Sequence, residues 1–202
     1  MLIAWSGGCD STLLLHSLLQ KQHYQLKSEN KSYQEFHEQV RTFSVTHAQM
    51  DAQKEQALAR KKIRSELKER GLKFEHIEID IRQEGNANGG SKQSVVWLAM
   101  VIPYLYDKED FYLAYVKEDD IWHFRSYLYD SFNNLQTLAG HEGKLQLPWE
   151  WKKKEEVVKE LSSIGLLKHV WWCAEPKKFG QRCGKCISCT KMIPFKKHFN
   201  SH

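Results

Sequence analysis

The sequence of 202 residues contains no apolar run that approaches the roughly 20 residues needed to span a membrane as a helix. It also lacks a secretory signal, because the short apolar stretch at residues 1–5 runs into a polar glycine turn and not into a cleavage site. Internal repeats and low-complexity tracts are absent as well. We therefore expect a cytoplasmic protein without a membrane partner.

Cysteine is scarce and unevenly placed. Four of the five cysteines lie between residues 173 and 189, whereas Cys9 stands alone near the start of the chain. In a cytoplasmic protein, such a cluster is more typical of a metal site than of disulfide bonds.

No large excess of charge of one sign is present, since 30 Lys and Arg face 25 Asp and Glu. The net charge of +5 suits an anionic ligand such as a nucleotide, but it does not require nucleic acid. A hydrophobic fraction of 41% and seven tryptophans indicate a chain that folds, and its length suits one domain with an appendage. The oligomeric state stays open, a homo-oligomer included.

Segments with strand patterns alternate with segments of helical periodicity. Strands are predicted at residues 2–5, 42–45, 74–81, 111–116 and 145–147. Helices are predicted after an N-cap at Asp10 or Ser11, at residues 51–70, at 95–106 with a kink at Pro103, after a cap at Asp119 or Asp120, and at 152–162. This alternation indicates a doubly wound α/β fold with a mainly parallel sheet of about five strands, whose ligand lies beyond their carboxyl ends.

Residues 6–12, Ser-Gly-Gly-Cys-Asp-Ser-Thr, join the first predicted strand to the first helix. Unpaired N–H groups and the helix dipole make such a turn an anion site, and glycines allow the backbone to approach phosphates closely. Asp10 fits an anion site if a divalent cation such as Mg²⁺ bridges it to the phosphates. An isolated Gly-Gly is more often an ordinary turn.

Ser-Gly-Gly-x-Asp-Ser lacks the Gly-Lys-Ser/Thr ending of a Walker loop. It resembles the PP-loop of enzymes that split ATP between its α- and β-phosphates. The resemblance implies a nucleotide site, with Asp10 and Ser11 in catalysis and with Cys9 at a variable position without a catalytic role. The predicted nucleotide-binding residues are Ser6, Gly7, Gly8, Asp10, Ser11 and Thr12.

The clustered cysteines, Cys173, Cys183, Cys186 and Cys189, have the spacing C-x9-C-x2-C-x2-C. Four thiolates suit a closed, structural Zn²⁺ site. Each Cys-x-x-Cys pair would also fit a redox role, although thioredoxin-like motifs follow a βαβ turn and not a late basic tail. The lysines around the cluster suit phosphate contacts or simple solvation, and the charge run at residues 152–156 is interpreted as a solvated helix start.

The PP-loop and the cysteine array together resemble the 7-cyano-7-deazaguanine synthases of queuosine biosynthesis. These zinc-containing carbon–nitrogen ligases have an adenine nucleotide alpha hydrolase-like fold and use ATP and ammonia to convert 7-carboxy-7-deazaguanine to its amide and then its nitrile. The family's Arg-Asn pair corresponds to Lys92-Gln93, which makes Lys92 a catalytic candidate at the α-phosphate. Its Tyr-Gly-Gln and Trp-Ser-Cys-Tyr runs correspond to residues 47–49 and 171–174.

The family's Tyr-Pro-Asp-Cys-Arg run, which is associated with the deazaguanine, is missing after the fourth strand. In its place, Asp119 or Asp120 could hold the guanidine-like edge of the base, Trp122 or Phe124 could stack on it, and Arg125 could face a carboxylate. Capping for the aspartate and helix packing for the aromatic residues are the simpler interpretations.

The functional hypothesis is an ATP-dependent ligase that adenylates a deazapurine carboxylate for attack by ammonia. Two alternatives stay open: a protein or nucleic-acid amine as acceptor, and a non-catalytic nucleotide-binding protein of the same fold. Residues 1–168 would form the nucleotide-binding α/β domain, and residues 169–202 a zinc-binding tail packed on it.

Overall fold

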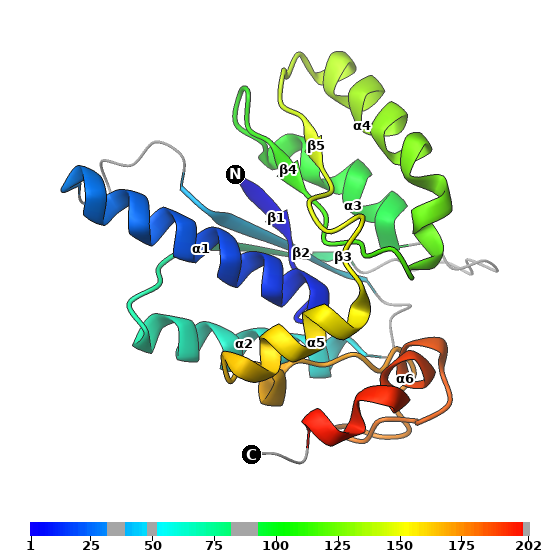
Figure 1. Cartoon of the computed structure of the whole chain (residues 1–202). Coiled ribbons are helices and arrows are strands. Elements are labelled where there is room, and N and C mark those ends of the chain that lie inside the picture. Colours follow the sequence, from blue (N-terminus) through cyan, green and yellow to red (C-terminus); the bar gives the residue numbers. More distant parts are fainter. Residues whose placement is uncertain (32–38, 48–51, 82–92, 200–202) are drawn as a thin grey trace.

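The five predicted strands form one parallel sheet in the computed structural model, which describes residues 1–31, 39–47, 52–81 and 93–199 (Figure 1). The strands are β1 (Leu2–Ala4), β2 (Arg41–His47), β3 (Glu75–Ile81), β4 (Phe111–Tyr112) and β5 (Leu145–Gln146). Their order is β3-β2-β1-β4-β5, and all four pairings are parallel. The order reverses between β1 and β4, so the ligand-binding switch point of the doubly wound fold lies at the carboxyl end of β1.

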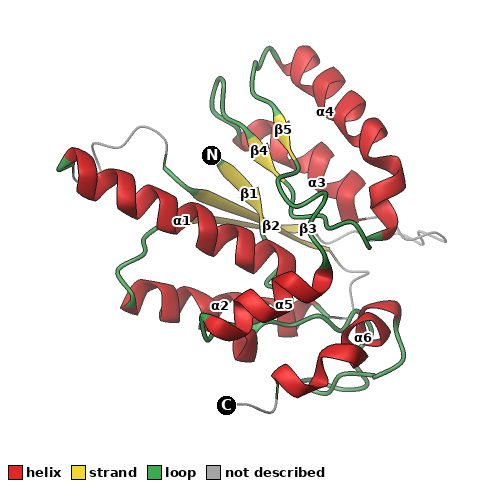
Figure 2. Cartoon of the chain, in the orientation of Figure 1, coloured by secondary structure: helices red, strands yellow, loops and turns green. Residues whose placement is uncertain are grey.

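Helices cover both faces of the sheet (Figure 2). On one face, α1 (Cys9–Glu29), α2 (Gln53–Glu69) and α5 (Lys154–Ser163) pack on Ile3 and Trp5. On the other face, α3 (Gln93–Val101) and α4 (Arg125–Ala139) pack on Leu2 and Ala4. Successive residues of β1 thus point to opposite faces and are all buried, as a central parallel strand requires. None of the described helices combines the length and apolar character of a membrane span.

Several element boundaries differ from the predicted ones. Gly8 is the N-cap of α1, so the prediction of Asp10 or Ser11 as N-cap is wrong. The reason is that the Ser11 hydroxyl lies within hydrogen-bond distance of Ser6 and is committed to the loop. At its other end α1 extends to Glu29, where Asn30 closes it in the left-handed conformation with φ 50°.

The later elements are shorter than predicted. Helix α3 ends at Val101 and continues as the 3₁₀ turn η2 (Ile102–Tyr104), because Pro103 supplies no N–H donor for a further α-helical turn. The fourth and fifth strands keep only two residues each. A 3₁₀ turn, η3 (Asp120–Phe124), with Asp119 as its N-cap, precedes α4, which ends at Ala139 with Gly140 as its C-cap.

After α5 the chain passes back beneath the sheet's carboxyl edge. It forms η4 (Leu167–His169), the short helix α6 (Ile187–Met192) and η5 (Ile193–His198), none of which was predicted. This C-terminal segment, orange and red in Figure 1, packs against α5 and lies next to α2, where Gly180 N donates to the Glu55 carboxylate at 3.2 Å. Lys191 also donates to the Glu118 carbonyl at 2.8 Å, which ties α6 to the loop after β4.

Candidate functional site

The loop between β1 and α1 is shaped by two glycines and two hydroxyl groups. Gly7 has φ +83°, and a Cβ there would lie 3.0 Å from the Gln56 carbonyl of α2. The Ser6 hydroxyl accepts from Gly8 N at 3.2 Å, and Ser6 N donates to the Ser11 hydroxyl at 3.3 Å. Only glycine combines that backbone conformation with so close an approach to α2, so the loop is a preformed turn.

The first turn of α1 presents its N–H groups to this loop. The first helical hydrogen bond runs from Thr12 N to Gly8 O at 3.2 Å, so the N–H groups that precede it have no helical acceptor. Such N–H groups, together with the helix dipole, have the chemistry of the anion site that the sequence predicts. The Thr12 hydroxyl is different: it is fully buried and accepts from the Trp5 indole at 3.1 Å, so it serves the core and not the loop surface.

A charged cluster lies at the start of α1. One carboxylate oxygen of Asp10 pairs with the ammonium group of Lys154, the first residue of α5, and its Oδ1 is buried without a hydrogen-bond partner among the described residues. Burial and the charge of Asp10 raise the pKa of Asp119, whose carboxylate accepts a hydrogen bond from the N–H of Val116 at 3.0 Å. Burial alone would lower the pKa of Lys154, but the attraction of Asp10 and Asp119 outweighs it and raises that pKa.

Lys154 belongs to this charged cluster, and sequence reasoning did not single it out. The charge run at residues 152–156 suggested a solvated helix start, yet only 17% of the Lys154 side chain is exposed. Its ammonium group reaches the switch point because α5 begins next to the N-terminus of α1. The available sequence signal was that a helix directly following a parallel strand begins at the ligand-binding edge of the sheet.

The four predicted substrate residues do not form one contact set among the described residues. Asp119 interacts electrostatically with Asp10 and Lys154. Asp120, by contrast, is exposed and pairs with Lys191 at 3.2 Å. The Arg125 guanidinium lies 4.1 Å from the ring centroid of Trp122.

The cluster around Trp122 contains two residues that the sequence did not single out. The Trp122 indole donates to the Glu150 carbonyl at 2.6 Å, and Arg125 forms an ion pair with the Glu150 carboxylate at 3.6 Å. The exposed ring of Trp151 meets Trp122 edge-on, with 5.5 Å between centroids. Trp122 thus offers aromatic surface beside a cation. Lys92, predicted at the α-phosphate, lies outside the described residues.

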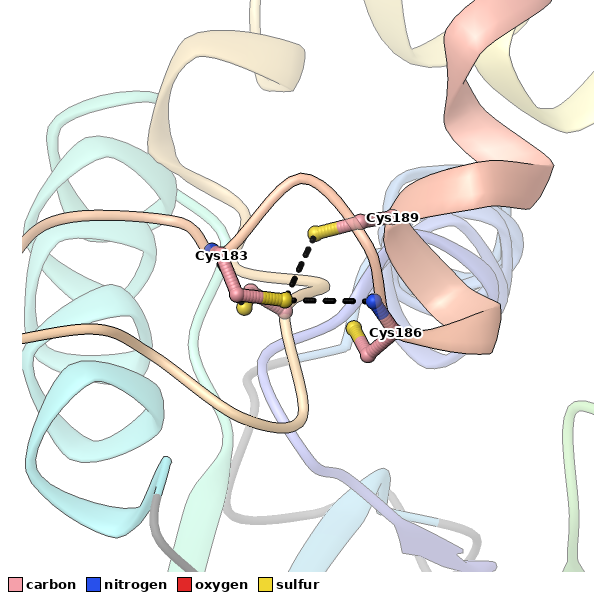
Figure 3. Close-up of side chains that lie close together, drawn as sticks. Cys183, Cys186 and Cys189 are labelled. Atoms are coloured by element: carbon pink, nitrogen blue, oxygen red, sulfur yellow. Dashed lines mark hydrogen bonds between the residues drawn. The ribbon is translucent and has the colours of Figure 1, made fainter.

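The structure brings the four clustered cysteines together. The sulfur atoms of Cys173, Cys183, Cys186 and Cys189 all lie within 4.8 Å of one another, and all four residues are buried. Figure 3 shows three of them converging, with 3.9 Å between the sulfurs of Cys183 and Cys189. A tetrahedral zinc site with Zn–S bonds of about 2.3 Å places its sulfurs about 3.8 Å apart.

Backbone N–H groups prepare the cluster for a cation. The N–H groups of Cys186 and Lys185 donate to the Cys183 sulfur and lower its pKa to about 6. Burial raises the pKa of Cys189 to about 12 and also raises that of Cys173, because buried thiolates without a cation are costly. Four soft, converging donors fit a structural zinc ion with no open coordination position.

The cysteine cluster and the phosphate loop are physically joined. Trp171 N donates to the Gly7 carbonyl at 3.0 Å, and the indole of the same Trp171 donates to the Cys173 carbonyl at 2.8 Å. Arg182 lies 3.6 Å above the Trp172 ring and braces this segment. Cys9 is buried beneath the loop, and burial raises its pKa to about 12, so it is no nucleophile there.

The sequence as a whole matches one family. No curated protein shows a significant match to the chain. The family model described as queuosine biosynthesis protein QueC matches residues 1–194, which include the loop at the switch point and all four clustered cysteines. The chain therefore belongs to the QueC family.

Proposed function

We propose that this chain is a ligase that activates the carboxylate of 7-carboxy-7-deazaguanine by adenylation and transfers the acyl group to ammonia. Its family consists of PP-loop ligases that use ATP in queuosine biosynthesis. The observation that carries the proposal is the loop itself: a preformed glycine turn, a helix N-terminus and an acid–base pair meet at the switch point of the sheet.

In the proposed reaction, an oxygen of the substrate carboxylate attacks the α-phosphorus of ATP and the bond to the β-phosphate breaks. Pyrophosphate leaves, and the acyl group is joined to AMP. Ammonia then attacks the acyl carbon and AMP departs, which gives the amide. Catalysis of this kind comes mainly from positioning and from neutralising the charge on the phosphates.

The loop supports the pyrophosphate half of this reaction. The first N–H groups of α1 and the Ser11 hydroxyl would bind the departing phosphates. Asp10 and Asp119 fit a Mg²⁺ ion, since Asp10 Oδ1 is buried without a partner, and the ion would neutralise phosphate charge. Lys154 then releases Asp10 and donates to a phosphate oxygen, because its raised pKa keeps it protonated.

The base would lie between Asp119 and the Trp122–Arg125 pair. Trp122 offers a ring for stacking, and the Arg125 guanidinium can exchange its partner Glu150 for the substrate carboxylate. One alternative keeps the adenylation and changes the acceptor to an amine of a protein or nucleic acid. It is favoured by the loss of the family's Tyr-Pro-Asp-Cys-Arg run at residues 117–125.

The test is to incubate the enzyme with ATP, Mg²⁺ and 7-carboxy-7-deazaguanine, with and without ammonia, and to follow AMP, pyrophosphate and the base by mass spectrometry. Amide or nitrile that appears only with ammonia supports the proposal. AMP formation without amide or nitrile supports the other acceptor, which shows itself as a mass gain on added protein or RNA. If ATP stays intact or yields ADP, the adenylation proposal is wrong.

A further inference from the structure

A second hollow lies between α2 and the edge strand β3. Its volume is about 750 Å³, in the range typical of small-molecule sites. Five cationic side chains and a single acidic one line it: Arg60, Lys61, Arg64, Lys68, Lys73 and Glu78. We call this hollow the α2–β3 cavity. Its excess of positive charge indicates an anionic ligand.

The cations of the α2–β3 cavity are arranged in a row. Arg60, Arg64 and Lys68 follow one another at four-residue steps, so they share one face of α2 at intervals of about 6 Å. Lys73 approaches from the turn before β3. Apart from Arg60, none of the five has a carboxylate at ion-pair distance within the part of the chain that the structure describes. Four cations are therefore available to a ligand.

Arg60 gives the cavity a fixed inner wall. The residue is only 4% exposed; its Nη1 donates to the Ser6 carbonyl at 3.2 Å and its Nη2 pairs with Glu78. Its Nε–H is buried without an acceptor among the described residues. His76 beside it is held by Thr42 at 2.8 Å through Nδ1, and its Nε2 lies 3.6 Å from the Glu78 carboxylate. The buried Nε–H of Arg60 without an acceptor favours an additional ligand.

The floor of the cavity is apolar. Ala57, Leu72 and Phe74 line it together with the aliphatic stems of the cations. A ligand that fills the cavity must therefore carry both negative groups and an apolar body. We propose that the α2–β3 cavity is a second anion site, which binds a small phosphorylated ligand with an aromatic body, the chemistry of a nucleotide.

The proposed ligand would lie one side chain away from the phosphate loop, because Arg60 lines the cavity and also contacts Ser6. The site nevertheless does not depend on the reaction proposed for that loop. Its phosphates would contact Arg64 and Lys68, and its aromatic part would rest on Phe74.

The experiment is a calorimetric titration with ADP, which the phosphate loop and the cavity can each bind. The titration is done in the absence of Mg²⁺. We expect two sites in the unmodified protein. Arg64→Glu combined with Lys68→Glu weakens the second site at least about tenfold, since two charge-assisted contacts are lost. The matched control, Lys54→Glu with Lys62→Glu, reverses two exposed charges of the same helix outside the cavity and retains both sites.

Two further measurements keep the result specific. Lys73→Glu, outside α2, weakens the second site as well if the cavity binds the ligand, and thermal melting shows that each variant is folded. Pyrophosphate is titrated in parallel and binds the cavity at least about tenfold more weakly than ADP if the aromatic body contributes. ADP binding that the Arg64→Glu, Lys68→Glu variant leaves unchanged, or pyrophosphate binding to the cavity as tight as that of ADP, overturns the proposal.

Discussion

The carboxylate of Asp10, at the proposed phosphate site, is balanced by the ammonium group of Lys154. We expect Asp10→Asn to reduce the formation of AMP and pyrophosphate at least about a hundredfold, because charge neutralisation at the phosphates is lost. Lys154→Met should raise the KM for ATP about tenfold or more and lower kcat/KM, while Lys154→Arg retains part of the activity.

Steady-state kinetics with a pyrophosphate-release assay checks both expectations. Lys153→Met, in the exposed neighbour of Lys154, is the control and should behave like the unmodified protein. Unchanged turnover in Asp10→Asn would remove the assignment of this loop to ATP.

His76 makes stability depend on pH. Burial, together with Arg60 and Arg64, lowers its pKa to about 4, from an ordinary value near 6.5 in the unfolded chain. Between these values the unfolded state binds more protons, so the free energy of unfolding falls as the pH falls from 7 to 5, by about 2 kcal/mol for this residue. Urea denaturation at both pH values should show a smaller loss for His76→Gln than for the exposed control His123→Gln. Equal losses in the two variants would show that His76 contributes nothing.

At the scale of elements, the turn between β1 and α1 depends on Gly7 for two separate reasons. The residue has φ +83°, and a Cβ would meet the Gln56 carbonyl at 3.0 Å. Gly71 has a similar φ of +77° but open space around the missing Cβ. We expect Gly71→Ala to cost about 1 kcal/mol of stability from the left-handed conformation alone.

Gly7→Ala should cost clearly more than Gly71→Ala and should also weaken ATP binding, because α2 or the loop must move. Thermal denaturation and ATP titration of the two variants separate these effects. If both variants lost the same stability and bound ATP equally well, the close packing of the loop on α2 would contribute to neither stability nor ATP binding.

The elements and the convergence of the four clustered cysteines were largely predictable from the sequence, because leucine periodicity, strand patterns and cysteine spacing are local properties. The position of Gly8 as the N-cap of α1 was not predictable, because Ser and Asp are the stronger capping residues. Only the fold shows that Ser11 contacts Ser6 and is not free to cap the helix. The partners of Trp122 lie at Glu150 and Trp151, in a loop distant in sequence, so no spacing rule could find that cluster.

At the scale of the whole molecule, the cysteine cluster braces the phosphate loop through Trp171. We expect about one zinc ion per chain, and we expect Cys186→Ser to lose most of it, to melt at a lower temperature and to bind ATP more weakly. Metal analysis, calorimetry and ATP titration test this. The control is Cys9→Ser, which should keep its zinc because Cys9 lies outside the cluster. Full zinc content and stability in Cys186→Ser would refute the four-thiolate site.

The hydrogen bond from Trp171 to the Gly7 carbonyl also joins two segments that are synthesised at different times. Residues 6–12 leave the ribosome before the segment that braces them, which is held by Cys173 through Cys189. Until that segment is made and folded, the loop lacks the hydrogen bond from Trp171, so we expect a chain truncated before residue 171 to gain less stabilisation from ATP. ATP binding would then discriminate between copies with and without a folded cysteine segment.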